Sequence, residues 1–337
     1  MTALLDILYP VYFTASSPIL LLLLFAASLI VVLPILIMWE RVLIRFSRAV
    51  EDAHKPGRPM VPRPAGPALL LAFVIILAPF LLTRSVAGFL MTGAIALLIG
   101  LYDDLRGLGG IIKPALSLLI AVPLILLGVY NYNPHLPFIG STTLTIIYPL
   151  LMIIGASIFS NASNMMDVYN GVLSSVLATA TVPLLAIFIL QRNLTMAVLS
   201  LVYLGVVLGF FFRHKYPSKI FPGDSGSLML GAMYFALVVM GQLEIIGILA
   251  FMPLIFNGFF IITSVRGFRE HKSFQRPVSL TENYEITANK GRGLPITLVR
   301  LLTVSHPLSE KDLALNIWLL SVFSSAFALI VYLLVGA

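Results

Sequence analysis

The side chains of this chain that could do chemistry gather in three short polar segments between long apolar stretches. The segments are GLYDDLRGLGG (Gly100 to Gly110), NASNMMDVYNG (Asn161 to Gly171) and FPGDSGS (Phe221 to Ser227). Carboxylates and carboxamides beside a bilayer are unfavourable to place and usually serve function. Their oxygens are the ligands that hard cations prefer. The pattern therefore indicates one oxygen-rich site assembled from three separate segments.

The first segment places two adjacent aspartates at the end of an apolar stretch. Asp103 and Asp104 are followed nine residues later by Lys113, directly before Pro114. Adjacent helical residues point about 100° apart, so the two carboxylates are not expected to chelate one metal ion equally. We expect one carboxylate to face the site and the other to cap or support it. The alternative is a charged helix end followed by a glycine-rich loop.

The second segment repeats a polar residue at every third position. Asn161, Asn164 and Asp167 follow this spacing, and Gly171 shares a helix face with the last two. Amide and carboxylate oxygens suit a hard cation, so we predict Mg²⁺, for which Mn²⁺ can substitute. The alternative is an Asn-rich helix start at the membrane interface.

The third segment forms a turn just before a helix. Asp224 can serve there as a helix N-cap, or as a metal ligand beside a helix N-terminus that favours phosphate. Phe221 can pack in the protein interior, or stack on a base of a bound nucleotide. The residues alone leave both pairs of alternatives open.

The composition is that of a polytopic membrane protein. The chain is 59% hydrophobic and 10% charged, with a mean hydropathy of +1.03, whereas a soluble domain has about 25% charged residues. It has no cysteine, which excludes thiolate chemistry. The net charge of +7 suits anionic lipid head groups and phosphorylated ligands. Nucleic acid is not expected as a partner, because the basic residues are spread over several short loops.

We predict an all-α membrane fold with about ten transmembrane helices, since a spanning helix needs about 20 apolar residues. Residues 1–337 form a single integral membrane domain, in which loop 264–312 is a substrate-binding insertion with a possible small β-hairpin. The expected spans are Pro18–Met38, Pro67–Leu82, Val86–Tyr102, Pro114–Tyr130, Tyr148–Phe159, Val172–Leu190, Ala197–Phe212, Leu228–Met240, Ile245–Ser264 and Leu313–Val335.

The basic residues predict how these spans are oriented. Of the 21 Lys and Arg residues, 19 fall in alternate loops, and the intervening loops hold only Arg84 and Arg192. The positive-inside rule then places both termini outside and all three polar segments on the cytoplasmic face. The spans hold no charged residue at mid-membrane, which argues against an ion-coupled transporter.

The three segments, in this order and spacing, resemble the polyprenyl-phosphate N-acetylhexosamine-1-phosphate transferase superfamily, which is glycosyltransferase family 4. It includes the bacterial translocase that makes the first peptidoglycan lipid, and the archaeal and eukaryotic dolichyl-phosphate GlcNAc-1-phosphate transferases. The resemblance covers nearly the whole chain, including ten spans and outside termini. Its motifs match the paired aspartates, the Asn-x-x-Asn-x-x-Asp segment, the Asn-Gly that follows it and the aromatic-x-Gly-Asp segment.

The resemblance assigns roles to these matched residues. The implied catalytic residues are Asp103, Asp104, Lys113 and Asp167. The implied metal ligands, for Mg²⁺ or Mn²⁺, are Asn164, Asp167 and Asp224. The implied substrate-binding residues are Asn161, Asn170, Gly171, Phe221, His271, Lys272 and Arg276.

Two departures from the family pattern bear on the substrate. The last cytoplasmic loop reads VRGFREHKSFQRPVSL, with one histidine instead of the His-His-His run of the peptidoglycan enzymes. This favours the archaeal or eukaryotic branch. Val168 stands where the family usually has glycine, so any contact there is through the backbone.

The resemblance implies transfer of GlcNAc-1-phosphate from UDP-GlcNAc to a polyprenyl (dolichyl) phosphate with release of UMP, the first step of lipid-linked oligosaccharide synthesis for N-glycosylation. The alternatives are the same reaction with undecaprenyl phosphate or another UDP-HexNAc for cell-wall polymers, and a non-enzymatic transporter of lipid or nucleotide sugar. The expected location is the plasma membrane, or the ER membrane in a eukaryote. The active site is expected on the cytoplasmic face, and the chain can form a homodimer.

Overall fold

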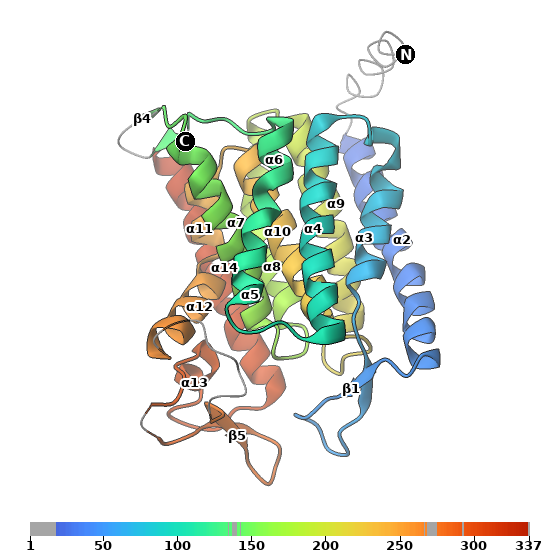
Figure 1. Cartoon of the computed structure of the whole chain (residues 1–337), viewed down its shortest axis with the longest axis vertical. Coiled ribbons are helices and arrows are strands. Elements are labelled where there is room, and N and C mark those ends of the chain that lie inside the picture. Colours follow the sequence, from blue (N-terminus) through green and yellow to red (C-terminus); the bar gives the residue numbers. More distant parts are fainter. Residues whose placement is uncertain are drawn as a thin grey trace.

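The long apolar stretches form a bundle of roughly parallel and antiparallel helices (Figure 1). The computed structural model describes residues 18–133, 135–136, 140–141, 143–265, 267, 275–291 and 293–335. The first half contains α2 (Pro18–Arg45), α3 (Gly66–Leu77), η1 (Ala78–Phe80), α4 (Arg84–Arg106), α5 (Ile112–Ser117), η2 (Leu118–Ala121) and α6 (Val122–Leu127). The second half contains α7 (Ile147–Met166), α8 (Val172–Leu190), α9 (Leu194–His214), α10 (Gly223–Met240), α11 (Glu244–Ala250), α12 (Met252–Ser264), α13 (Leu298–Leu302) and α14 (Glu310–Val335).

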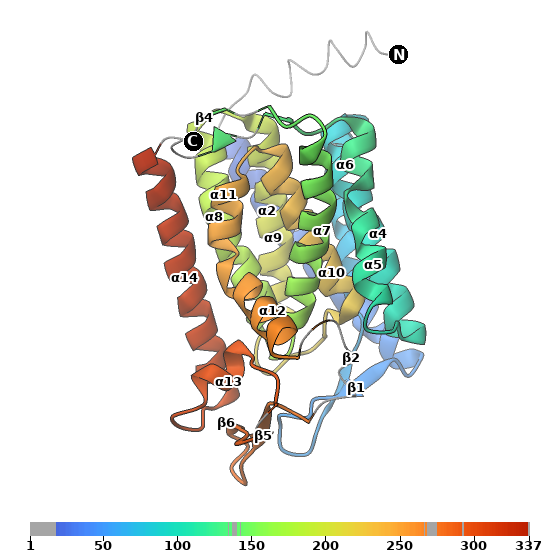
Figure 2. The same cartoon turned by 60° about the vertical axis from the view of Figure 1, so that its left-hand side comes forward.

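The strands are short, and within the described ranges they form three antiparallel hairpins. They are β1 (Ala49–Glu51) with β2 (Met60–Pro62), β3 (His135–Leu136) with β4 (Gly140–Ser141), and β5 (Val278–Leu280) with β6 (Ile286–Ala288). The hairpin expected in loop 264–312 is therefore confirmed, whereas β1–β2 and the small helix α13 were not predicted. Figures 1 and 2 show β1, β5 and α13 at one end of the bundle, opposite the end where α2 begins and α14 ends.

The chain is a polytopic, mostly helical membrane protein. Among the described residues, seven helices are long and apolar enough to cross a membrane, or eight if α11 and α12 form one span bent by 73°. Two shorter apolar helical stretches, Gly66–Phe80 and Ile112–Leu127, fall where the second and fourth spans were expected. The count of ten spans and the outward position of the termini stay predictions.

Two helix boundaries differ from the expected ones in a way that matters for the polar segments. Helix α7 continues to Met166 instead of ending at Phe159, because its carboxamides lie between helices and need not face water. Helix α10 begins at Gly223, with Pro222 as its N-cap residue. Asp224 therefore lies in the first turn of α10, and the reading of Asp224 as the N-cap is wrong.

Helix α10 is the centre of the bundle. It packs against α3, α4, α7, α8, α9 and α11, and nearly all of its residues are buried. Small residues allow the close approach, as is usual between membrane helices. A Cβ added at Gly231 would lie 2.4 Å from Ser163 Oγ of α7, and one at Gly100 of α4 would lie 2.4 Å from the Asp224 carbonyl oxygen. The Gly100 contact sets the end of α4 directly against the first turn of α10.

Candidate active site

Asp104 joins the end of α4 to the start of α10. Its carboxylate accepts hydrogen bonds from the backbone N–H groups of Asp224 and Ser225, both at 2.9 Å. These belong to the N–H groups that a helix start leaves without an intrahelical partner. Gly223 has φ +70°, and a Cβ there would lie 2.8 Å from Asp104 Oδ2. Asp104, whose side chain is 3% exposed, therefore fixes the turn that carries Asp224.

The Asp224 carboxylate pairs with two cations, Lys113 and Arg63. Its Oδ1 lies 3.0 Å from Lys113 Nζ and its Oδ2 lies 3.0 Å from an Arg63 guanidinium nitrogen. Asn164 also donates to Oδ1, at 2.5 Å, and to Ser227 Oγ, at 2.8 Å. The Asp224 carboxylate thus joins side chains from α5, α7 and the segment after β2.

Lys113 lies among oxygens of three helices. Its ammonium is 2.7 Å from Asp103 Oδ2, 2.9 Å from Asn164 Oδ1 and 3.0 Å from Asp224 Oδ1. Asp103 also accepts from the backbone N–H of Leu108 at 2.6 Å, which holds the loop after α4. The adjacent aspartates consequently do different things: Asp103 positions Lys113, and Asp104 anchors α10.

Arg63 is a site residue that sequence reasoning missed. It bridges Asp104, at 2.8 Å, and Asp224, and its side chain stays 34% exposed towards a cavity. Burial alone would lower the pKa of Arg63, but the two carboxylates outweigh burial and raise it. In the sequence, Arg63 is one of several basic residues in loop 40–66, and these were interpreted only as residues that set the membrane orientation. The available signal was its position between Pro62 and Pro64, just before α3 begins at Gly66.

Asp167 is the C-cap residue of α7, directly after Met166, and lines the same cavity. Burial raises the pKa of Asp167 to about 8; nearby Arg63 opposes this, and Asp224 reinforces it. Its Oδ1 lies 3.6 Å from Nε2 of the buried His214. The cavity holds about 200 Å³ and is lined by Val50, Arg63, Asn164, Asp167, Val168, Tyr169, His214, Phe221, Gly223 and Asp224.

A second, larger cavity lies beside the first. It holds about 580 Å³ between α7, α12 and the β5–β6 hairpin, and it shares the wall residues Val168 and Tyr169 with the smaller cavity. Arg276, with an exposed side chain, lines this larger cavity together with Arg58 and apolar residues. His271 and Lys272 lie outside the described residues.

Comparison with known proteins finds a family that part of this chain resembles. The Glycosyl transferase family 4 description matches residues 86–242, which contain α4, α7, the start of α10 and the three polar segments. This part of the chain is similar to that family.

Three relatives show which known proteins this chain is similar to. A protein of Methanocaldococcus jannaschii, provisionally named a glycosyltransferase, is 27% identical over 84% of this chain and 87% of its own length. A protein of Saccharolobus solfataricus, provisionally named UDP-N-acetylglucosamine–dolichyl-phosphate N-acetylglucosaminephosphotransferase, is 26% identical over 57% of this chain and 62% of its own. A phospho-N-acetylmuramoyl-pentapeptide-transferase of Bacillus licheniformis is 31% identical over 50% of this chain and 54% of its own.

The donor set of this site fits a hard divalent cation. Asn164, Asp167 and Asp224 all line the smaller cavity and offer amide and carboxylate oxygens. Partial burial raises the pKa of Asp167 against the opposing charge of Arg63, so a bound cation would favour its ionised form. We therefore find that the three predicted metal ligands lie together around one cavity.

The remaining predicted substrate-binding residues are distributed differently. Phe221 lines the smaller cavity. Asn161 is buried and donates to Ser117 Oγ and the Ser157 carbonyl, both at 2.8 Å, where α5 and η2 pack on α7. Asn170 is buried, and Gly171, with φ +81°, precedes α8. Asn161, Asn170 and Gly171 do not line either cavity.

Proposed function

We propose that this chain transfers GlcNAc-1-phosphate from UDP-GlcNAc to a polyprenyl phosphate of the dolichyl type and releases UMP. The observation that carries the proposal is the meeting of Lys113 and Arg63 with Asp224 and Asn164 at the edge of a polar cavity. Two cations beside a divalent-cation donor set suit a pyrophosphate better than any uncharged ligand. The product would begin a lipid-linked oligosaccharide for N-glycosylation.

The reaction needs little covalent chemistry from the protein. A phosphate oxygen of the lipid forms a bond to the sugar-bearing phosphorus, the bond from that phosphorus to the bridging oxygen breaks, and UMP leaves with the electron pair. The second pKa of a phosphate monoester is about 6, so the lipid phosphate is mostly ionised at pH 7 and a strong general base is not required. The protein therefore acts mainly by alignment and charge neutralisation.

Each polar side chain has a distinct role in this proposal. Lys113 and Arg63 bind the pyrophosphate oxygens, and Asp103 and Asp104 hold these two cations in place. Asn164, Asp167 and Asp224 would hold Mg²⁺. When bound, that ion neutralises phosphate charge as the leaving group departs.

The two cavities offer separate places for the two ends of UDP-GlcNAc. We place the pyrophosphate in the smaller cavity, where Phe221 can stack on uracil, and the sugar toward the larger cavity, where Arg276 lies. The shared wall of Val168 and Tyr169 would then separate the two ends. His271 and Lys272 stay proposed sugar or phosphate contacts from the same loop.

The proposed orientation places this end of the bundle in the cytoplasm, since alternate loops rich in Lys and Arg lie here. Ten spans with outside termini would be consistent with it. A cytoplasmic site gives access to a nucleotide sugar from the aqueous phase and to the lipid phosphate from the inner leaflet.

The deciding experiment measures UMP release by the purified chain from UDP-GlcNAc, dolichyl phosphate and Mg²⁺, with the mass of the lipid product. A transporter would move substrate between vesicle compartments without forming UMP. Parallel reactions with undecaprenyl phosphate, and with UDP-MurNAc-pentapeptide in place of UDP-GlcNAc, test the proposed branch. Turnover of the pentapeptide donor at the rate of UDP-GlcNAc would contradict the donor assignment.

A further inference from the structure

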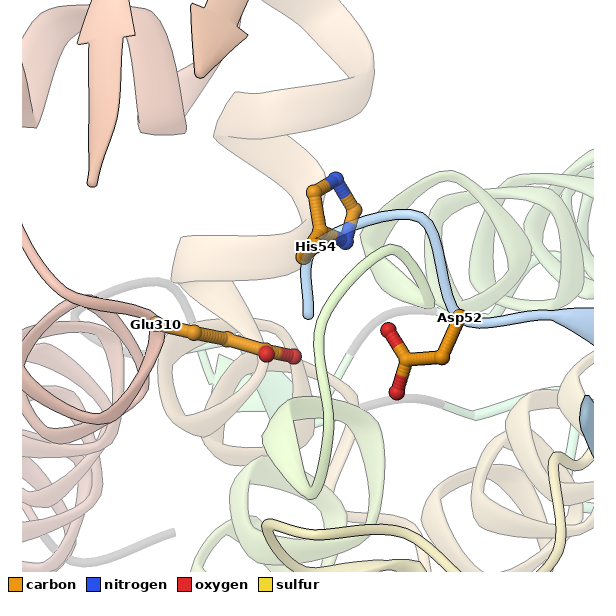
Figure 3. Close-up of side chains that lie close together, drawn as sticks. All are labelled: Asp52, His54 and Glu310. Atoms are coloured by element: carbon orange, nitrogen blue, oxygen red, sulfur yellow. The ribbon is translucent and has the colours of Figure 1, made fainter. Parts of the chain in front are cut away.

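A buried ionic cluster lies outside the cavities and reaches the loop between α7 and α8. It consists of Asp52, Lys55, Asn170 and Glu310, which we call the Asn170 clasp. Asp52 and Glu310 are 2% and 4% exposed, and both come from segments far from residue 170 in sequence. In Figure 3 the carboxylates of Asp52 and Glu310 point toward one another, from the first loop and from the start of α14.

Every polar group of the Asn170 side chain is engaged in this clasp or next to it. Its Nδ2 donates to Asp52 Oδ2 at 3.1 Å and to Glu310 Oε1, and its Oδ1 accepts from the Ser218 backbone N–H at 2.9 Å. The Asn170 backbone N–H also donates to Glu310 Oε1, at 2.9 Å. Glu310 therefore holds both the side chain and the backbone of Asn170.

Lys55 supplies the positive charge of the clasp. Its ammonium pairs with Asp52 and lies 3.6 Å from Glu310 Oε2. Asp52, His54 and Glu310 could in principle share a metal ion, since their ligand atoms lie within 4.8 Å of one another. The Lys55 ammonium supplies a positive charge beside both carboxylates, and Glu310 Oε2 accepts no hydrogen bond among the described residues.

The clasp acts on the loop that separates the two cavities. Residues 167–170 run from the proposed metal ligand Asp167 through the shared wall of Val168 and Tyr169 to Asn170. His54, two residues after Asp52, packs against Tyr169 with the two rings tilted by 35° and their centroids 4.8 Å apart. The wall is thus held at Tyr169 by the first loop and at Asn170 by α14.

We propose that Glu310 is a positioning residue, which acts through Asn170 to fix loop 167–170 and thereby both the Asp167 carboxylate and the wall between the cavities. Glu310 itself touches neither cavity. The inference about catalysis rests on the proposed function, whereas the inference about the loop does not. A buried carboxylate that only stabilised the bundle would not affect substrate or metal affinity.

The first test measures hydrogen–deuterium exchange of peptides covering residues 166–171 in detergent-solubilised protein. Glu310→Ala should speed exchange at Asn170 by about tenfold to a hundredfold, which corresponds to losing a hydrogen bond to a charged group. The matched control is Glu40→Ala, because Glu40 is also a buried carboxylate at this end of the bundle but pairs with Arg213. Equal exchange in the two variants would overturn the proposal.

The second test measures steady-state kinetics of the same variants. Glu310→Ala should raise the KM for UDP-GlcNAc and the Mg²⁺ concentration for half-maximal rate by about fivefold or more, with a smaller change in kcat. Glu310→Gln retains an Oε1 acceptor for Asn170 and should restore most of the loss. Glu40→Ala should lower the Tm without moving either constant.

The two tests separate the clasp from the proposed function. If wild-type protein releases no UMP, the proposed function fails, and the exchange experiment still decides whether Glu310 holds the loop. If wild type turns over but Glu310→Ala lowers the Tm without changing KM or Mg²⁺ dependence, Glu310 has a structural role alone and the positioning proposal is overturned.

Discussion

Asp103, Asp104 and Asp224 are chemically identical side chains that the fold gives three different environments. Asp103 holds Lys113 and the loop after α4, Asp104 accepts the first N–H groups of α10, and Asp224 faces the cavity with a cation on each oxygen. Only Asp224 combines cavity exposure with cation pairing. Removing its charge should therefore affect the reaction more than the fold.

We expect Asp224→Asn to lower kcat/KM by about a hundredfold or more, on the order of 3 kcal/mol, because a proposed metal ligand and the partner of two cations lose their charge. UMP release at saturating Mg²⁺ measures the change, and the Tm checks the fold. Glu51→Gln, at an exposed carboxylate paired with Arg58, is the control and should be silent. Near-normal turnover of Asp224→Asn would contradict the proposal that Asp224 is a metal ligand.

Arg276 tests whether the larger cavity binds substrate. If the guanidinium makes paired hydrogen bonds to phosphate or sugar, Arg276→Lys should lose roughly tenfold in kcat/KM, about 1.4 kcal/mol, although the charge is retained. If Arg276 only helps to set topology, the variant should behave as wild type. Kinetics with UDP-GlcNAc distinguishes the two results.

His54 should make stability depend on pH. Burial lowers the pKa of His54 against the opposing pull of Glu310 and Asp52. The unfolded chain then takes up a proton near pH 6.5, before the folded chain does, so His54 weakens stability as pH falls through and below that value. Between pH 7.5 and 5.5 the Tm of wild type should fall more than that of His54→Gln. Equal decreases would show that His54 is not the titrating group.

At the scale of elements, the site depends on where helix ends meet. Helix α4 ends at Arg106 and α7 at Met166, while α10 begins at Gly223 and α5 at Ile112, all at one end of the bundle. Each contributes one or two polar residues, and the segment after β2 adds Arg63. The spacing of these helix ends is set by small residues where α4 and α10 touch.

Gly100→Ala tests this close contact. The new Cβ would lie 2.4 Å from the Asp224 carbonyl oxygen, a backbone atom that cannot move without displacing the first turn of α10. We expect a lower Tm by several degrees and a larger proportional loss of kcat, since overpacking commonly costs about 1–3 kcal/mol. Leu98→Ala, at an exposed position of the same helix, should leave kcat unchanged. Wild-type kinetics of Gly100→Ala would contradict the contact.

At the scale of the whole molecule, the polar site lies at the same end as two of the described hairpins, β1–β2 and β5–β6, whereas β3–β4 lies at the opposite end. The β1–β2 and β5–β6 hairpins and α13 lie below the lower end of the bundle, where the helix ends carry the site residues (Figure 2). The absence of cysteine allows this arrangement to be placed relative to the membrane by single-cysteine labelling.

We expect Lys290→Cys to be labelled by a membrane-impermeant thiol reagent only after cells are opened, and Gln191→Cys to be labelled in intact cells. Both side chains are exposed, and they lie in loops that the positive-inside rule assigns to opposite faces. The cysteine-free parent is the control for background. Labelling of Lys290→Cys in intact cells would reverse the proposed orientation.

The sequence by itself determined the membrane fold and most helix positions, because both follow from the length and apolar character of local stretches. The structure places a helix or a helical segment at each of the ten expected stretches. The polar segments were also local signals, since carboxylates and carboxamides between apolar spans stand out whatever their partners are.

Only the tertiary structure decided which of these residues meet. Local sequence could not show that Arg63 turns inward from a loop with many basic residues, or that Asn161 packs between helices while Asn164 reaches Asp224. Nor could it connect Glu310 to Asn170, 140 residues away in the chain. Such contacts depend on how helices pack against one another, and hydrophobic periodicity specifies a buried face without naming the residue opposite it.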